Sequence, residues 1–231
     1  MQLRWMPVVL ILMGMVSASG ALAQTQDSGA AAQAPAAQPQ KKAAHGPAQI
    51  TLGGSFYQAL NSPSSGMGTL QTPANSPGFL LEIRYIARPL VGFEFSYGYN
   101  PADQVIEPLK GNCGLVCAFA PLELHAKAST IGLDWVFSKR FGPIRPFALV
   151  GPGFFIDSTN QSVYVVNTVA RMSLVTGGGA DWNIGPKFGV RAQIDGNFYR
   201  APNLSALFPA TGKTTYTLTP AVGVFYVFGR R

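Results

Sequence analysis

The sequence predicts an all-β protein, an eight-stranded antiparallel up-and-down transmembrane β-barrel. Apolar and polar residues alternate with a period of two in eight segments, and the connections between these segments alternate between long and short. Charged residues make up 12% of the chain, against about 25% in soluble domains. These observations argue against a soluble cytosolic enzyme, a coiled coil and a helical bundle.

The predicted strands cover most of the chain after residue 48. In the segment 90–99, Phe93, Phe95, Tyr97 and Tyr99 alternate with small or charged residues, so one face of this strand is aromatic. The other segments share this pattern and span residues 49–60, 79–87, 122–138, 144–156, 167–183, 187–199 and 215–228.

The lengths of the connections between strands predict at which rim of the barrel each connection lies. Long connections span 61–78, 100–121, 157–166 and 200–214, and short ones span 88–90, 139–143 and 184–186. Outer-membrane barrels have short turns in the periplasm and long loops outside the cell. An even number of strands then returns both ends of the barrel to the periplasm.

The hairpins predict specific cross-strand pairs. Around Pro89, Arg84 lies opposite Glu94 and Tyr85 lies opposite Phe93, so charged and aromatic faces both match. Around Gly185, the expected pairs are Trp182 with Phe188 and Ala180 with Val190.

The polar face is expected to point inward. It is rich in glycine, which weakens a strand facing water but suits a crowded, narrow lumen, and eight strands leave only enough room for side chains. The predicted polar network comprises Glu82, Arg84, Glu94, Asp134, Arg171, Asp181, Arg191, Gln193 and Asp195. We expect Arg84 to pair with Glu94, and Arg191 with Asp181 and Asp195. An ion network of this kind explains the carboxylates without assigning them acid–base catalysis.

The first residues have the pattern of a secretory signal peptide. Arg4 precedes an apolar stretch at 5–16, and small residues lead to a cleavage site after Ala23. The stretch is shorter than the roughly 20 residues of a membrane-spanning helix, which disfavours a retained anchor. The segment 24–48 is rich in Ala, Gln and Pro and is expected to be a disordered leader, since its prolines interrupt any alanine-rich helix. The barrel is therefore assigned to 49–231.

The chain resembles the small outer-membrane β-barrels of the OmpA-like transmembrane and opacity-porin type. The segments that carry the resemblance are 145–153, 177–182, 189–195 and 216–228. It implies a location in the outer membrane of a Gram-negative-type bacterium, with lipid, lipopolysaccharide and the barrel insertion machinery as partners. In this family the insertion machinery reads the apolar residues of the last strand. The matching residues are Tyr216, Leu218, Val222, Val224, Tyr226 and Phe228, although Gly229, Arg230 and Arg231 follow them.

Cys113 and Cys117 are the only cysteines and lie in a predicted extracellular loop. Because the protein is expected to reach an oxidising compartment, we expect them to form a disulfide. A structural zinc site needs four ligands, and this loop contains no histidine. We therefore expect neither a metal site nor a cofactor.

A catalytic site was considered because some barrels of this kind modify lipid A. Glu123, His125 and Ser129 share a face of the predicted strand 122–138 and offer orienter, base and nucleophile. The lipid A deacylases, however, have histidine and serine two residues apart, a pattern missing from this sequence. We expect a non-enzymatic barrel with an envelope-structural and surface-interaction role through its loops. The alternatives are a narrow channel for small or apolar solutes and, less favoured, a lipid-modifying enzyme.

The net charge of +7 does not indicate nucleic-acid binding, because no basic run exceeds two residues. The excess positive charge falls at short turns and the C-terminus, on Arg88, Lys139, Arg140, Arg145, Lys187, Arg230 and Arg231. Peptidoglycan carboxylates or lipid phosphates at the periplasmic rim are therefore further candidate partners. The aromatic residues Tyr85, Tyr97, Tyr99, Trp135, Trp182 and Tyr226 are expected at the membrane interfaces. We expect a monomer.

Overall fold

The computed structural model describes residues 48–87, 90–109, 120–159 and 165–228. The predicted signal peptide, all but the last residue of the leader, and both cysteines lie outside these ranges. Within them, no helix has the length and apolarity needed to cross a membrane.

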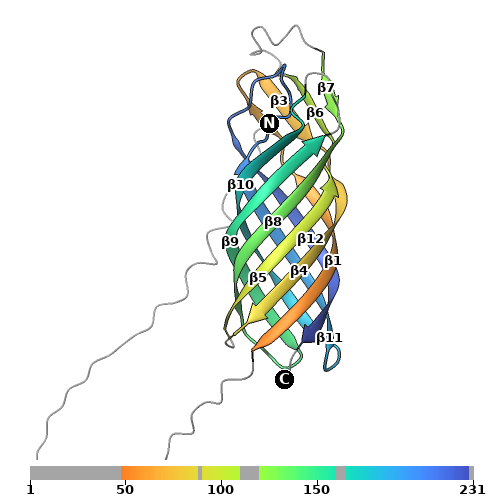
Figure 1. Ribbon diagram of the computed structural model, residues 1–231, viewed down its shortest axis with the longest axis vertical. Helices are drawn as coiled ribbons and strands as arrows, with labels where there is room; N and C mark the ends of the chain where they lie inside the picture. The colour runs from red at the N-terminus through yellow and green to blue at the C-terminus, as the bar shows by residue number, and fades with distance from the viewer. Residues whose placement is uncertain (1–47, 88–89, 110–119, 160–164, 229–231) are drawn as a thin grey trace, which may run out of the picture. The chain divides into compact units, whose positions relative to one another are not determined.

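Eight antiparallel strands form a closed barrel, which confirms the predicted fold class (Figure 1). The strands are β1 (Gln49–Asn61), β4 (Ser76–Ile86), β5 (Val91–Pro101), β8 (Ala126–Ser138), β9 (Ile144–Thr159), β10 (Thr168–Asn183), β11 (Phe188–Arg200) and β12 (Thr214–Phe228). Each barrel strand pairs with the next one along the chain, and β1 pairs with β12 to close the ring.

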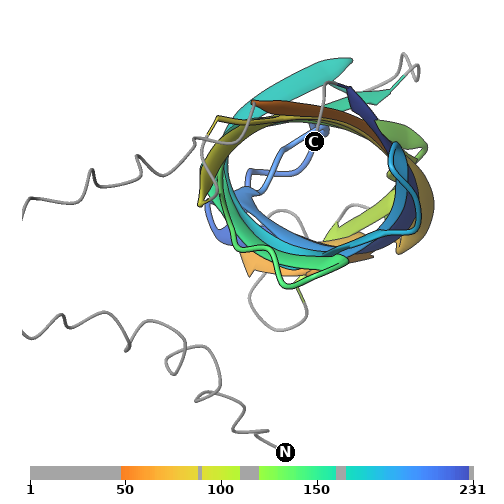
Figure 2. The same cartoon turned by 90° about the horizontal axis from the view of Figure 1, so that it is seen from below.

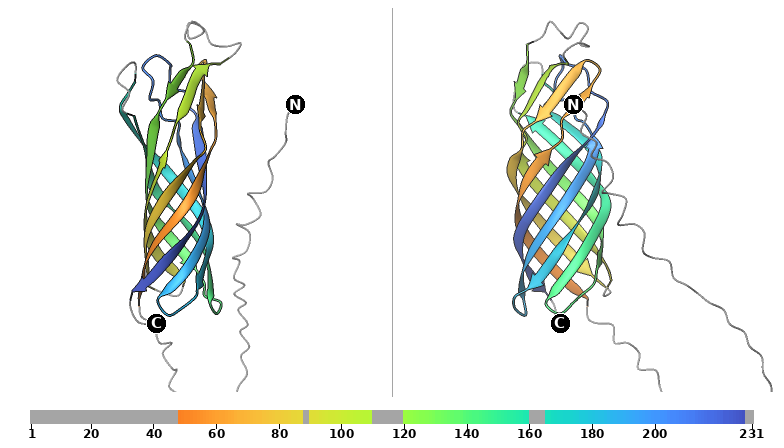
Figure 3. Two further views of the ribbon diagram at one scale, coloured as in Figure 1. Left: turned by 90° about the vertical axis from the view of Figure 1, so that its right-hand side faces the viewer. Right: turned by 180° about the vertical axis from the view of Figure 1, so that it is seen from behind.

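The long connections contain a second sheet that the sequence pattern did not predict. Its four strands are β2 (Ser64–Gly66), β3 (Thr69–Pro73), β6 (Gln104–Pro108) and β7 (Leu122–Leu124), in the order β2-β3-β6-β7. Figure 3 shows this sheet at the end of the barrel opposite the end of β12, where the long loops lie. The two loops after β1 and β5 are therefore joined by the β3–β6 pairing into one structure.

The segment 122–138 is two strands rather than the single strand expected. β7 leaves the barrel to pair with β6, and β8 begins after His125. Leu124 and Ala126 are both buried while His125 between them is exposed. Because the alternation continues across the break, the period-two pattern could not reveal the change of partner.

The register of the first hairpin is confirmed, with Arg84 opposite Glu94. In the hairpin of β10 and β11 the expected register was wrong by two residues, because Trp182 lies opposite Val190 and not Phe188. A shift of two keeps every side chain on the same face of the strand. The assignment of inward and outward faces is thus unaffected.

The outer face of the barrel is apolar. Leu81, Phe95 and Val222 are 46–62% exposed and point away from the lumen, as the surface of a barrel in lipid requires. Aromatic side chains gather at two levels. The lower level contains Tyr85, Phe93, Trp135, Trp182, Phe188, Tyr226 and Phe228, and the upper level contains Phe79, Tyr97, Tyr99, Phe154, Phe198 and Tyr216. Aromatic residues favour the two membrane interfaces, so these levels mark the membrane boundaries.

Candidate functional site

Four charged side chains form a closed ring across the lumen. Arg84 lies between Glu94 (Nε to Oε2, 2.5 Å) and Asp181 (Nη1 to Oδ2, 3.2 Å). Arg191 lies between the same two acids, at 2.7 Å from Asp181 Oδ1 and 3.3 Å from Glu94 Oε2. All four side chains are at most 4% exposed. We call this set the charged ring. It connects the β4–β5 hairpin to the β10–β11 hairpin on the opposite side of the barrel.

Two further acids and one amide extend the charged ring. Glu82 Oε2 lies 3.2 Å from Arg191 Nη1, and Gln193 Nε2 donates to Glu82 Oε1 and Asp195 Oδ2, both at 2.7 Å. Asp195 therefore bonds to Gln193, whereas the sequence analysis expected Arg191 as its partner. Asp134 is opposite Glu94 on β8 and buried, and its Oδ1 has no hydrogen-bond partner.

One arginine, Arg171, lies elsewhere than expected. Arg171 is half-buried opposite Phe155, near the extracellular end of β10, and forms no ion pair with any acid in the described ranges. It is therefore not part of the network to which the sequence analysis assigned it. Arg145 is the second residue of β9, directly after the short turn 139–143, and so lies near the periplasmic end of the barrel as expected; its cross-strand partner is Asp181. The alternation of inward and outward residues along β10 does not distinguish the level of Arg171 from that of the charged ring.

Aromatic and aliphatic side chains fill the lumen on the periplasmic side of the charged ring. The Phe147 ring lies 3.9 Å from the Arg84 guanidinium and 5.4 Å from that of Arg191, and Phe225 lies 5.4 Å from Arg191. Guanidinium groups over aromatic faces are attracted by the ring quadrupole. On the extracellular side of the charged ring, Gly177 of β10 has no room for a side chain, since a Cβ there would collide with Asp195. The lumen is thus closely packed on both sides of the charged ring.

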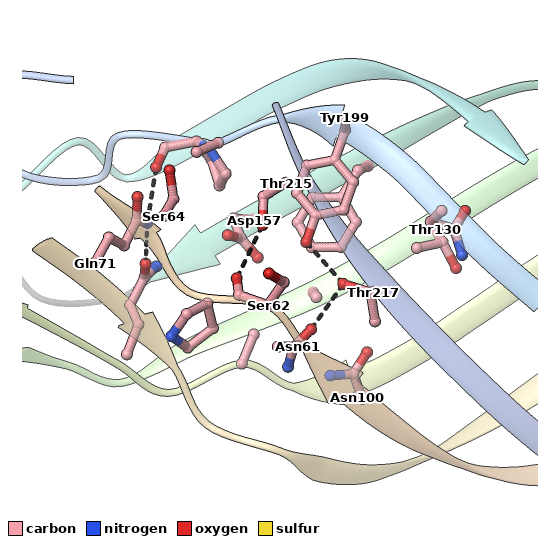
Figure 4. A pocket seen from close by; sticks show the side chains of 18 of the residues that line it. Asn61, Ser62, Ser64, Gln71, Asn100, Thr130, Asp157, Tyr199, Thr215 and Thr217 are labelled. Carbon is pink, nitrogen blue, oxygen red and sulfur yellow. Dashed lines mark hydrogen bonds between the residues drawn. The ribbon is translucent and has the colours of Figure 1, made fainter. Parts of the chain in front are cut away.

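A small polar cavity lies in the lumen on the extracellular side of the charged ring (Figure 4). Its volume, measured as the space open to the centre of a water molecule, is about 20 Å³. Neutral groups around it bond to one another: Tyr57 Oη donates to Asn100 Oδ1 at 2.9 Å, and Thr217 Oγ1 donates to Asn61 Oδ1 at 2.7 Å. Tyr199 and Thr217 share a hydrogen bond of 2.8 Å. The wall of the cavity is therefore rich in oxygen atoms and largely uncharged.

Asp157 is the one acidic residue that lines this cavity. It lies in the part of β9 that extends beyond the upper aromatic level, beside the outward-facing Lys127 and Ser158. Its flanking partners in the barrel are Ala128 and Val169, which have no polar side-chain atoms. Asp157 is 3% exposed, and Oδ1 has no hydrogen-bond partner. Burial raises the pKa of the Asp157 carboxyl to about 7.

The segment 201–213, between β11 and β12, covers the cavity from the extracellular side. Figure 2 shows it (blue) inside the ring of strands. Leu204 and Phe208 are buried in an apolar cluster with Ile106 and Leu124 of the second sheet. We call this segment the cap.

Hydrogen bonds connect the cap to other long loops. Gln71 of β3 donates from Nε2 to the Pro202 carbonyl at 2.9 Å, and Ser64 of β2 bonds to Thr211 at 2.7 Å. Val166 N donates to the Leu204 carbonyl at 2.7 Å. The cap thus joins the second sheet and the end of the β9–β10 connection into one extracellular unit. The cap was not predicted, although Leu204, Leu207 and Phe208 are apolar residues in a connection expected to be an exposed loop.

The residues considered for catalysis do not assemble. His125 Nδ1 lies 3.4 Å from Asp103 Oδ2, at the surface. Glu123 belongs to the second sheet, whereas Ser129 lies on the barrel strand β8. In the described ranges, no hydrogen bond joins His125 to Ser129, and no group of three His, Cys, Asp or Glu side chains is arranged to hold a metal.

The proposed insertion residues share one face of the last strand. All of them point away from the lumen along β12, as does Pro220, while the residues that alternate with this face point inward. Their recognition by the insertion machinery remains a prediction. The disulfide between Cys113 and Cys117 also remains a prediction, because both residues lie outside the described ranges.

Comparisons with solved structures identify the same fold. The outer membrane protein OprG from Pseudomonas aeruginosa matches with a TM-score of 0.55 and 13% identity, over 80% of this chain and 97% of that chain. Neisserial surface protein A matches with a TM-score of 0.52 and 13% identity, over 78% and 97%. No protein-family profile and no curated protein matches the sequence. The chain therefore has the fold of the small eight-stranded outer-membrane barrels, as the resemblance implied. Its apolar exterior is consistent with a location in the outer membrane.

Proposed function

We propose that this chain is a non-enzymatic outer-membrane barrel with an envelope-structural role and a surface-interaction role, the latter carried by its extracellular unit. One observation carries the proposal: the lumen is occupied by the charged ring and the cap, whereas the second sheet extends beyond the barrel. Ser65, Thr72 and Glu123 of that sheet are exposed. Contacts with other molecules are therefore easier at the extracellular surface than through the lumen.

A narrow channel is the alternative function, and the same contacts argue against it. To cross the barrel, a solute would have to displace the cap and then break ion pairs of the charged ring. The arginines of this ring also contact the aromatic rings of Phe147 and Phe225. Breaking a buried ion pair leaves uncompensated charge and costs about 3–5 kcal/mol. Lipid modification is less favoured still, because His125 and Ser129 are not joined.

The proposed partners follow from the surfaces of the barrel. The apolar belt contacts lipid and the lipid part of lipopolysaccharide, and the outward residues of β12 contact the insertion machinery. Lys139, Arg140 and Lys187 at the periplasmic turns are placed to meet lipid phosphates or peptidoglycan carboxylates. We propose that the barrel acts as a monomer.

Planar-bilayer recordings on the purified, refolded full chain test the closed lumen. We expect no steady openings in the wild type. The Arg84→Ala variant tests whether loss of one ring member creates a conducting path. Steady openings in the wild type that Arg84→Ala abolishes or enlarges would contradict the proposal and establish the channel.

Display on the surface of a host bacterium tests the surface role. The readouts are cell settling and adherence to uncoated plastic, with release of a periplasmic enzyme as a measure of envelope integrity. We expect a Thr72→Lys and Glu123→Lys double variant to change settling and adherence but not enzyme release. Lys139→Ala, at the periplasmic end, is the matched control. If cells with and without the protein behave alike in all three assays, the proposal fails.

A further inference from the structure

The polar cavity beneath the cap has the size of a single small occupant. Its volume of about 20 Å³ exceeds the roughly 10–15 Å³ that one water molecule needs. It is too small for a sugar or a lipid chain. Whatever occupies the cavity is therefore a water molecule or a small ion.

The neutral polar groups of the cavity wall form hydrogen bonds with one another, but the Asp157 carboxyl group forms none with them. Asn61, Thr217 and Tyr199 form a chain of side-chain hydrogen bonds, whereas no side-chain hydrogen bond or ion pair from the described residues reaches the Asp157 carboxyl group. Leaving a buried carboxylate without a partner is costly, so such groups are normally paired or neutralised. Figure 4 shows Asp157 among these neutral groups.

Charged side chains near Asp157 do not neutralise it. Arg171 stands on the adjacent strand, two residues from Val169, which is the direct partner of Asp157, yet it forms no ion pair with Asp157. Lys127, on the other adjacent strand, faces outward. None of the described residues that line the cavity is a lysine, arginine or histidine, so the wall itself supplies no positive charge to balance Asp157.

We propose that the cavity is a binding site for one monovalent cation, Na⁺ or K⁺, held by the Asp157 carboxylate and by neutral oxygen atoms of the wall. The wall supplies amide and hydroxyl oxygens from residues such as Asn61, Asn197 and Thr217. One carboxylate balances a single positive charge, whereas Ca²⁺ sites in proteins generally use several carboxylates. Asp157 lies on β9, and the oxygen atoms of the wall come from β1, β11 and β12. Binding of the cation therefore stabilises contacts between barrel strands, which loss of the cap contacts leaves in place.

Thermal unfolding of the full chain in detergent tests this site. The unfolding temperature is measured at about pH 8, where an ordinary carboxyl is ionised, in NaCl, KCl and N-methylglucamine chloride at equal ionic strength. We expect Na⁺ or K⁺ to raise the unfolding temperature by about 2–4 °C over the large organic cation. We expect Asp157→Asn to remove this difference without unfolding the barrel.

Two control variants separate the site from general salt effects. Asp103→Asn removes an exposed acid next to His125 and should keep the wild-type cation dependence. Arg171→Gln should also keep it. A wild type that unfolds at the same temperature in all three salts would show that neither Na⁺ nor K⁺ binds in the cavity, and would overturn the proposal. Loss of the dependence in Arg171→Gln, or its retention in Asp157→Asn, would overturn it as well.

Discussion

The two halves of the lumen are closed in different ways. In the periplasmic half, charges of opposite sign and aromatic rings from facing barrel strands meet directly. In the extracellular half, neutral polar groups surround a small cavity, and the cap closes it with apolar residues that come from connections between strands. The contacts that close the periplasmic half thus come from the barrel strands alone. Those that close the extracellular half also require contacts between loops that are distant in the sequence.

This difference predicts that the periplasmic half contributes more to global stability. Loss of a strand contact in a closed barrel affects the whole ring, while loss of a loop contact can remain local. The following predictions test that contrast.

The largest effect is expected from Arg84→Ala. It removes one of the two cations of the charged ring and leaves Glu94 and Asp181 undercompensated, at a cost of about 3–5 kcal/mol in the free energy of unfolding. The double variant with Glu94→Ala should lose less than the sum of the two single variants. Urea unfolding in detergent micelles, followed by tryptophan fluorescence, measures both. Strictly additive losses would show that the pair is not coupled.

A smaller loss is expected from Gly177→Ala. The added Cβ would collide with Asp195, and overpacking of this kind costs about 1–3 kcal/mol. Gly185→Ala is the matched control, because a Cβ there meets no atom within 4 Å. The same unfolding assay applies. Equal stability of the two variants would mean that the lumen at Gly177 has more room than the structure shows.

Changes to the cap should affect the extracellular half alone. Leu204→Ala combined with Phe208→Ala removes two buried side chains of the apolar cluster. We expect faster proteolysis within 201–213 in the lipid-embedded protein, with a change of less than about 1 kcal/mol in barrel unfolding. A large drop in barrel stability would show that the two halves unfold together, and would contradict the expectation that the extracellular half opens independently.

The smallest effect is expected from reduction of the predicted disulfide. A bridge between Cys113 and Cys117 closes a short ring, so its contribution to global stability is small. Reduction should leave the heat-modifiable electrophoretic mobility of the barrel unchanged and make the surrounding loop cleavable in intact cells. Two free thiols in the mass spectrum of the non-reduced protein would refute the bridge.

Local patterns predicted the barrel but not the extracellular unit. Alternation along each strand identified the faces, and the short turn at 88–90 fixed the pairing of Arg84 with Glu94. Four residues separate β10 from β11, as they separate β4 from β5, yet the expected register of the β10–β11 hairpin was wrong by two residues. Turn length alone therefore does not determine the register. β3 and β6 are distant in the sequence, and each is too short for its residue pattern to indicate which strand it pairs with.

The same limit applies to the candidate sites. The sequence analysis could pair Arg84 with Glu94 because they share a hairpin, but not Arg84 with Asp181, which is distant in the chain. The distinction between Arg171 and the charged ring depends on height along the barrel, which alternation does not encode. Asp157 was likewise unremarkable in the sequence, since only the closed barrel buries it.

The charged ring also bears on the order of folding. Arg84 and Glu94, like Arg191 and Asp181, are 10 residues apart, so each pair can form as soon as its hairpin does. The two contacts that join the pairs connect residues 97 apart. Contacts between distant residues form slowly, because a long loop must close first. The two hairpins can therefore enter the membrane as locally neutralised units, and the cross-contacts between them form only when the first and last strands meet.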